Sequence, residues 1–229
     1  MYWQEETPLS QFQVPDSVLD LLFTIECRSL PVDHAHALYQ ALSRRLPWLE
    51  SGQLGVHSIH VAGSQNGWER PSQDDGQELL LSRRTKFCLR VPKDRLEEVR
   101  RELTGATLDV AGHPLTLGAA KIKPLAKDPT LFARYVAIQD YQDEDRFLTW
   151  AVRELDGVGV RVRKALCGKT LSLSTPQGPL AVRSLLLAAL PPDEAVRLQE
   201  RGLGPYRHLG CGIFIPHKGI DPVRQIRDD

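Results

Sequence analysis

The sequence has no hydrophobic run long enough to cross a membrane. Its longest uninterrupted apolar run, residues 185–190, falls far short of the roughly 20 residues that a membrane-spanning helix needs. The first residues, MYWQEETPLSQF, lack the basic-then-apolar pattern of a secretory signal peptide. We therefore expect a cytoplasmic protein with no membrane partner.

The chain also lacks closely spaced cysteines. Its four cysteines are at positions 27, 88, 167 and 211, and no two of them form a Cys-x-x-Cys pair. This spacing argues against a dense disulfide framework and against the common zinc motifs. We expect free thiols, and we predict neither a metal site nor a cofactor.

Net charge is absent as well, because 29 basic residues balance 29 acidic ones, yet the charges are unevenly spread. No lysine precedes position 79, whereas three basic islands follow later in the chain. Such islands are either solvated surface or contacts for a polyanion. We favour nucleic-acid contact, and the candidates in the first two islands are Arg83, Arg84, Lys86, Arg161, Arg163 and Lys164.

The order of strand-like and helical segments is the same in the two halves of this 229-residue chain. Apolar alternation and helical spacing predict strands at 18–27, 56–62, 85–91, 113–123, 131–138, 160–174, 179–190 and 211–216, and helices at 34–46, 93–103, 144–155 and 192–201. Asp33 is expected to cap the first helix. Two βαββαβ units predict an α+β fold of two tandem ferredoxin-like domains, an architecture that RNA-recognition modules share. We place an N-terminal domain at 1–123, a linker at 124–129 and a C-terminal domain at 130–229.

Residues 202–212 read GLGPYRHLGCG, with two Gly-x-Gly pairs between the last helix and the last strand. Glycine leaves backbone N–H groups unshielded, so this loop can follow a phosphodiester backbone closely. Gly202 is alternatively explained as a helix cap. The candidates for phosphate contact in and after the loop are Gly202, Gly204, Arg207, His208, Gly210, Gly212, His217 and Lys218.

Two phosphate-binding motifs fail on inspection. The segment Gly168-Lys169-Thr170 ends like a P-loop, but Arg163 stands at the position of its first glycine. In the loop at 202, Arg207 stands at the third glycine of a dinucleotide motif. The sequence therefore predicts neither a nucleoside triphosphate site nor a dinucleotide site.

Three segments carry a resemblance to a known family: GLGPYRHLGCG followed by IFIPHK, PVDHAHALYQALSRRLPWLE, and GVHSIHVAGSQNGWERP. They resemble the CRISPR-associated endoribonucleases of the sixth Cas family, in the subgroup from myxobacterial-type loci. The resemblance covers nearly the whole chain and implies metal-independent cleavage of a repeat RNA beside its stem-loop. It implies attack of a ribose 2′-oxygen on phosphorus, which leaves a 2′,3′-cyclic phosphate and a 5′-hydroxyl. The implied partners are the CRISPR repeat hairpin, its processed guide product and other effector subunits.

This reaction needs a proton acceptor and a proton donor, and histidine, with a pKa near ~6.5, can serve as either. The family places its catalytic histidine in or just after the first helix. We rank His34 first, His57 second as its proton-transfer partner, and His36 third, while Tyr39 is expected to pack. A structural or surface imidazole is the alternative for each histidine.

Other uses of these residues remain open at this stage. His34 with His36, or His57 with His60, offers ligands for a metal ion, but side chains at those spacings diverge. Trp48 and Trp68 are either base-stacking or core residues. A non-catalytic RNA-binding subunit of an effector complex is the alternative function, and an enzyme acting on a small metabolite is a third.

Overall fold

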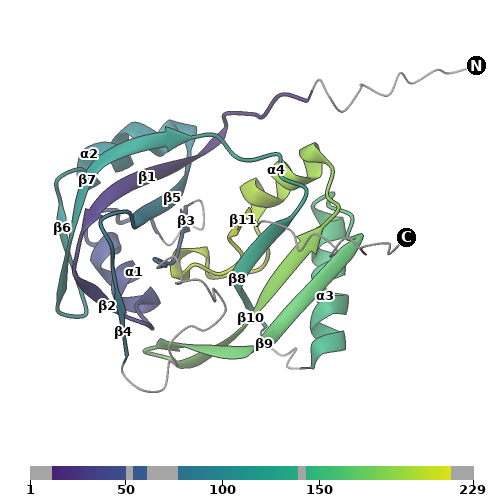
Figure 1. Cartoon of the computed structure of the whole chain (residues 1–229). Coiled ribbons are helices and arrows are strands. Elements are labelled where there is room, and N and C mark those ends of the chain that lie inside the picture. The colour runs from purple at the N-terminus through teal and green to yellow at the C-terminus, as the bar shows by residue number, and fades with distance from the viewer. Residues whose placement is uncertain (1–11, 50–53, 61–76, 139–142, 218–229) are drawn as a thin grey trace, which may run out of the picture.

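The computed structural model describes residues 12–49, 54–60, 77–138 and 143–217, and its strands form two main antiparallel sheets (Figure 1). The first sheet has the order β3 (Gly55–Val56), β5 (Lys86–Pro92), β1 (Val18–Glu26), β7 (His113–Lys123) and β6 (Thr107–Val110). Helices α1 (Ala35–Ser43) and α2 (Leu96–Leu103) belong to this half. A separate two-stranded sheet pairs β2 (Ser29–Pro31) with β4 (Glu78–Leu80).

The second sheet has the order β11 (Phe214–Pro216), β8 (Leu131–Ala137), β10 (Gly178–Ala188) and β9 (Lys164–Thr175), with helices α3 (Glu144–Gly157) and α4 (Pro192–Arg201). Each half therefore places its fourth strand beside its first, and its third beside its second. A helix follows the first strand and another follows the third. This is the ferredoxin-like arrangement in tandem, and the predicted fold class is confirmed.

The strands of each sheet come from one half of the chain only, residues 18–123 and 131–216. A division into domains at 1–123 and 130–229, with a linker between them, stays our proposal. Within the described residues, no helix combines the length and apolar content that a membrane crossing requires.

Several local expectations differ from the structure. The strand predicted at 56–62 ends at Val56, its described residues 57–60 are not in a strand, and 61–62 lie outside the described residues. The strand predicted from 160 begins only at Lys164, and the strand predicted from 211 begins at Phe214. The hairpin strand β6 and the β2–β4 pair were not expected from the sequence.

Asp33 does not cap α1. The N-cap residue is His34, which makes no side-chain capping bond. Asp33 Oδ2 instead accepts a hydrogen bond from the backbone N–H of Ser174, 2.7 Å away at the far end of β9. Asp33, which was expected to cap the start of α1, thus joins the two halves of the chain instead.

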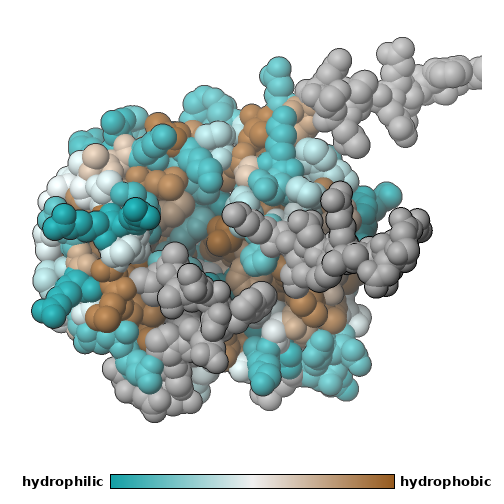
Figure 2. Space-filling model, viewed as in Figure 1, coloured by the Kyte–Doolittle hydropathy of each residue, from teal (hydrophilic) through white to brown (hydrophobic). Residues whose placement is uncertain are grey.

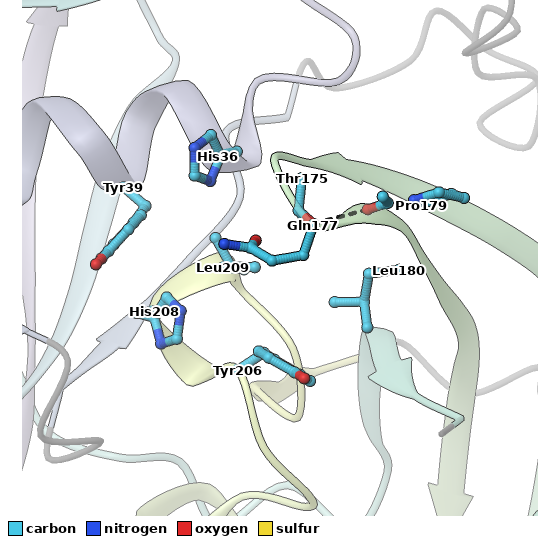
Figure 3. Close-up of a pocket in the computed structure, with 10 residues that line it drawn as sticks. His36, Tyr39, Thr175, Gln177, Pro179, Leu180, Tyr206, His208 and Leu209 are labelled. Atoms are coloured by element: carbon cyan, nitrogen blue, oxygen red, sulfur yellow. Dashed lines mark hydrogen bonds between the residues drawn. The ribbon is translucent and has the colours of Figure 1, made fainter. Parts of the chain in front are cut away.

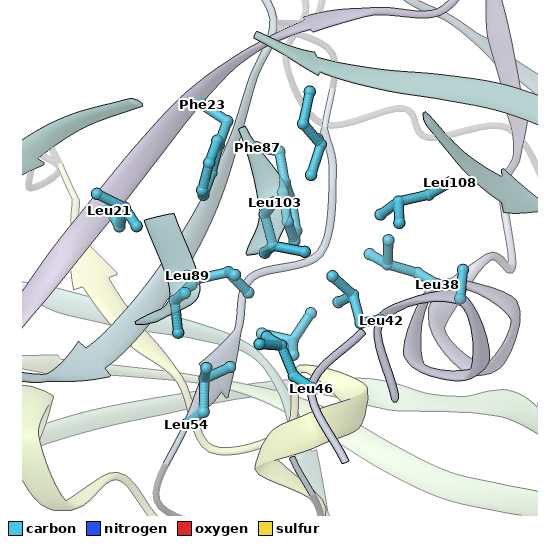
Figure 4. Close-up of a cluster of buried hydrophobic side chains, with 14 of the residues drawn as sticks. Leu21, Phe23, Leu38, Leu42, Leu46, Leu54, Phe87, Leu89, Leu103 and Leu108 are labelled. Carbon is cyan, nitrogen blue, oxygen red and sulfur yellow. The ribbon is translucent and has the colours of Figure 1, made fainter. Parts of the chain in front are cut away.

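Each half has its own hydrophobic core. In the first half, Leu38 and Leu42 of α1 pack with Phe23 and Phe87 of the sheet, and all four are at most 1% exposed (Figure 4). In the second half, Phe147 on α3 and Leu185 on β10 belong to the corresponding cluster. A third, smaller cluster joins the halves, because it contains residues of α1, β8, β9, β10 and the glycine loop: Ala35, Tyr135, Leu173, Val182 and Cys211. Figure 2 shows hydrophilic and hydrophobic residues interspersed over the visible face.

A buried ion pair also joins the two halves. Arg90 on β5 is fully buried, and its guanidinium donates to both carboxylate oxygens of Asp20 on β1, at 2.8 and 3.0 Å. Its remaining terminal nitrogen donates to the backbone carbonyls of Gln199 in α4 and Phe214 in β11, at 3.0 and 2.8 Å. Along β5, Lys86, Cys88 and Arg90 alternate with apolar residues, a pattern that predicts a cationic strand face, but the complete burial of Arg90 shows that this prediction is wrong for Arg90. One side chain therefore fixes the second half against the first.

We predict that Arg90→Met lowers the free energy of unfolding by about 3 to 5 kcal/mol, because it leaves the buried Asp20 carboxylate unpaired. The double variant Arg90→Met/Asp20→Leu should be more stable than Arg90→Met alone, since it removes the stranded charge. Urea unfolding of the three proteins measures this. A double variant that is less stable than Arg90→Met would contradict it.

Candidate functional site

An open pocket of about 390 Å³ lies where the two halves meet (Figure 3). Three elements line it: helix α1, the β9–β10 hairpin turn and the glycine loop. The lining residues are His36, Tyr39, Thr175, Gln177, Gly178, Pro179, Leu180, Tyr206, His208 and Leu209. Its volume lies within the range of about 300 to 1,000 Å³ that is typical of ligand sites.

Helix α1 contributes His36 and Tyr39 to the pocket. Their rings lie 5.9 Å apart between centroids, and Tyr39 lies 4.7 Å from the ring of His208. Residues 35, 38 and 42 occupy the buried face of the helix, so His36 and Tyr39 are turned toward the second half. The structure thus brings His36 and His208 to one pocket (Figure 3).

His34, ranked first from the sequence, is only 1% exposed and has both ring nitrogens bonded to backbone. Its Nδ1 lies 2.9 Å from the carbonyl oxygen of Pro31, and its Nε2 accepts the N–H of Ile59 at 3.1 Å. A carbonyl only accepts and an N–H only donates, so the ring is neutral with its proton on Nδ1. In this conformation His34 holds the segment at Ile59 against α1 and offers no nitrogen to a substrate.

His57 lies in a different place, next to Asp20 and Arg90. Its Nε2 is 3.7 Å from Asp20 Oδ1, too far for a hydrogen bond, and no other described group bonds to it. Burial lowers the pKa of His57, and the nearby Asp20 carboxylate only partly offsets this effect. The pKa of Asp20 is also lowered, because its interactions with His57 and Arg90 outweigh its own burial. His57 does not line the pocket that holds His36.

Asp20, His57 and Cys88 bring potential metal-ligand atoms within 4.8 Å of one another. Arg90 already occupies both carboxylate oxygens of Asp20. Burial raises the pKa of the Cys88 thiol, which disfavours the thiolate that binds metals. These residues therefore fit a buried ion pair better than a cation.

Most of the glycine loop packs inward. Gly202, Gly210 and Gly212 are buried, and only Gly204 of the four is exposed. A Cβ at Gly202, whose φ is +70°, would lie 2.6 Å from the carbonyl oxygen of Gly212, so the two Gly-x-Gly pairs approach each other closely. In this conformation three of the four glycines serve loop packing, and phosphate contact at Gly204 stays a prediction.

Arg207 also turns inward rather than toward a polyanion. Its guanidinium donates to the carbonyl oxygen of Arg201. Burial, together with the neighbouring Arg90, lowers its pKa to about 10. The expectation that Arg207 supplies charge to an RNA phosphate is therefore not supported by its position.

The other basic candidates differ in their exposure and in their bonding partners. Arg163 is bonded through both terminal nitrogens to Glu194, at 3.0 and 3.1 Å. The ring of His217 lies 5.5 Å from that of Phe132, and Lys218 lies outside the described residues. Arg163 is itself exposed, and so are Arg83, Arg84, Lys86, Arg161 and Lys164.

A second pocket, of about 200 Å³, is lined by His57 together with cationic side chains. Lys86, Arg134 and His60 line it, and Arg134 Nε donates to His60 Nε2 at 2.9 Å. Gly210 lines it as well, so the glycine loop reaches both pockets. Of the two candidate tryptophans, Trp48 packs on the first core and donates to Glu98, and Trp68 lies outside the described residues.

Sequence reasoning missed the Asp20–Arg90 pair, and it missed that the β9–β10 turn, predicted as a hairpin turn from TPQGP, lines the pocket. An acid in the middle of the apolar strand VLDLLFTIE is the signal for the first, because a buried carboxylate needs a cationic partner. The two residues face each other in the register of β1 and β5. The proline and glycine of TPQGP signal the turn itself, but not its place at the pocket, which depends on how the two halves pack.

The fold and the pocket define a two-part ferredoxin-like protein with a polar site built from both parts. A family model described as "Cas6 Crispr" matches residues 19–219. The chain is 35% identical over 199 residues to the CRISPR-associated endonuclease Cas6 of Myxococcus xanthus (strain DK1622), covering 86% of this chain and 81% of that protein. The chain therefore belongs to the Cas6 family, and the resemblance seen in the sequence is confirmed.

Solved structures agree at the level of fold. A "CRISPR associated protein Cas6" has a TM-score of 0.59 at 12% identity, covering 88% of this chain and 100% of that one. A Cas6-related protein from Pyrococcus furiosus has a TM-score of 0.58 at 11% identity, covering 86% and 98%. These likenesses support the tandem ferredoxin-like fold.

We predict that His34→Ala lowers the free energy of unfolding by about 1 to 3 kcal/mol, because it strands the N–H of Ile59 and the carbonyl of Pro31. His36→Ala, which removes no bond of this kind, should change it by less than about 0.5 kcal/mol. Urea denaturation compares the two variants. Equal losses would contradict the structural role assigned to His34.

The lowered pKa of His57 predicts a pH-dependent stability. Because its folded-state pKa is lowered, only the unfolded chain gains a proton there as the pH falls below about 6.5, and the folded state is destabilised. Between pH 7.5 and 5, wild type should lose stability more steeply than His57→Asn, by at most about 1.4 kcal/mol per pH unit. Asp20 titrates below this window when unfolded. Parallel stability curves would contradict the prediction.

Proposed function

We propose that this protein is a metal-independent endoribonuclease that cleaves CRISPR repeat RNA to release guide RNAs. Membership of the Cas6 family supports cleavage of RNA from CRISPR loci, and the Myxococcus xanthus relative is named as an endonuclease. The observation that carries the proposal is the pair of imidazoles, His36 and His208, in one open pocket. Two imidazoles supply both proton transfers that the reaction requires.

The reaction we propose is a transesterification within the RNA. The 2′-oxygen of one nucleotide bonds to the adjacent phosphorus, and the bond from phosphorus to the 5′-oxygen of the next nucleotide breaks. The 2′-hydroxyl loses a proton and the departing 5′-oxygen gains one, so the products are a 2′,3′-cyclic phosphate and a 5′-hydroxyl. No water enters the bond-breaking step.

The order of the catalytic candidates changes with the structure. His36 replaces His34 as the first candidate, because His36 lines the pocket whereas both nitrogens of His34 are bonded to backbone. His57 lies beside the Asp20–Arg90 pair and lines the second pocket with Lys86 and Arg134, so it stays the second candidate.

We propose that the repeat hairpin binds across exposed cationic side chains of both halves. Lys86 and Arg134 line the second pocket, and their positive charges would attract a phosphate there. The exposed candidates retained for this role are Arg83, Arg84, Lys86, Arg161, Lys164 and Gly204. Cytoplasmic location, contact with the processed guide product and association with effector subunits belong to the same proposal.

Incubation of labelled CRISPR repeat RNA with the protein in EDTA tests the function. Wild type should cleave and leave a cyclic phosphate, and His36→Ala should cleave at least about 100-fold more slowly. Lys169→Ala, on the exposed strand β9 outside the pocket, serves as a matched control for handling and folding. A 2′-deoxy nucleotide immediately 5′ to the cut should abolish the reaction.

Three results would contradict the proposal. Cleavage of the 2′-deoxy RNA would rule out 2′-oxygen attack. Loss of cleavage in EDTA that added Mg²⁺ restores would rule out metal independence. Tight binding of the repeat without cleavage would favour the alternative, a non-catalytic subunit of an effector complex.

A further inference from the structure

His208 points into the pocket because the residues around it are anchored elsewhere. It lies in the 3-10 helix Arg207–Leu209, in which Arg207 turns inward to the carbonyl of Arg201 and Leu209 is 6% exposed. On the far side, a Cβ at Gly210 would lie 2.7 Å from Oγ of Ser58, so the loop sits directly against the first half. His208 is thus held at a fixed place opposite α1 (Figure 3).

The backbone at Tyr206 is strained in a way that serves this placement. Tyr206 has a left-handed conformation, φ 64° and ψ 36°, which costs a non-glycine residue about 1 to 2 kcal/mol. Its carbonyl oxygen accepts the N–H groups of Leu209 and Cys211, at 2.9 and 3.1 Å. Strain that surrounding bonds maintain in this way is concentrated at functional sites.

Two tyrosine rings contact the imidazole of His208. The ring of Tyr39 lies 4.7 Å away at 50°, and that of Tyr206 lies 6.1 Å away, edge-on at 69°. These two contacts fix the orientation of the His208 imidazole at the edge of the pocket, opposite His36 on α1.

We propose that His208 is the general acid of this reaction and that His36 is the general base, an assignment that rests on the function proposed above. His36 takes the proton of the 2′-hydroxyl as the 2′-oxygen bonds to phosphorus. His208 gives its proton to the 5′-oxygen as the bond from phosphorus to that oxygen breaks. The two rings come from different halves of the chain, so each half supplies one proton-transfer group.

A sulfur substitution at the leaving atom separates the two roles. In a repeat RNA whose 5′-bridging oxygen at the cut is replaced by sulfur, the leaving thiolate needs no proton. His208→Ala should cleave the oxygen RNA at least about 100-fold more slowly than wild type and the sulfur RNA within about 10-fold of wild type. His36→Ala should stay slow on both RNAs, because the 2′-hydroxyl still needs a base.

Single-turnover rates at saturating protein keep binding out of the comparison, and His208→Gln replaces the alanine variant if the latter fails to fold. His113→Ala, on β7 outside the pocket, is the matched control for loss of a histidine. An equal loss by His208→Ala on both RNAs, or no loss on either, would overturn the assignment. A defect seen only in the dissociation constant of 2′-deoxy repeat RNA would also overturn it, since it would make His208 a binding residue. If wild type cleaves neither RNA, the proposed function fails and this assignment fails with it.

Discussion

The arrangement of this molecule depends on one buried cation. Arg90 has no exposed surface, and its donors reach both oxygens of Asp20 and two backbone carbonyls of the other half. A guanidinium suits this position because it is planar and presents several donors in fixed directions. Since α4 and β11 flank the glycine loop, the side chain that fixes them also fixes where the loop meets α1.

Two histidines separated by one residue have different roles in this fold. His34 is a structural link whose two nitrogens join the Pro31 carbonyl to the Ile59 N–H. His36, two positions on, faces the pocket. Because positions i and i+2 on a helix point in different directions, the link at His34 sets the position of the helix without occupying the site.

The sequence predicted the fold well because the hydrophobic periodicity of both halves is regular. The spacing of Leu38, Ala41 and Leu42 gave the first helix, and the alternation of Phe87, Leu89 and Val91 gave the strand beside it. The same alternation placed Arg90 on a cationic face of the strand. A pattern of polar positions tells the two faces of a strand apart, but it does not tell whether a face meets solvent or the second half of the chain. The segment at 57–60 was misread for a related reason, since its backbone bonds go to the His34 ring and to β5 and not to a longer ladder.

The site was harder to predict than the fold because it arises from packing between segments distant in the chain. The glycine pairs at 202–212 were correctly recognised as unusual, yet most of their unusual geometry serves close backbone contact inside the loop. His208 was identified from its place in a basic loop, whereas its neighbours Tyr39 and Tyr206 come together only in three dimensions. Sequence reasoning pointed to a loop and a helix that both line the pocket, whereas the placement of each residue within them follows only from the structure.

Both halves of the chain contribute residues to the pocket, and this has an evolutionary consequence. Neither half contains a complete set of lining residues, so a recombination event that exchanged one half for that of a distant relative would also have to preserve the contact surface between them. The pairing of Asp33 with the Ser174 backbone and of Arg90 with two carbonyls makes that surface specific in geometry. We therefore expect the two halves to evolve together rather than to be exchanged separately, although their architectures are similar.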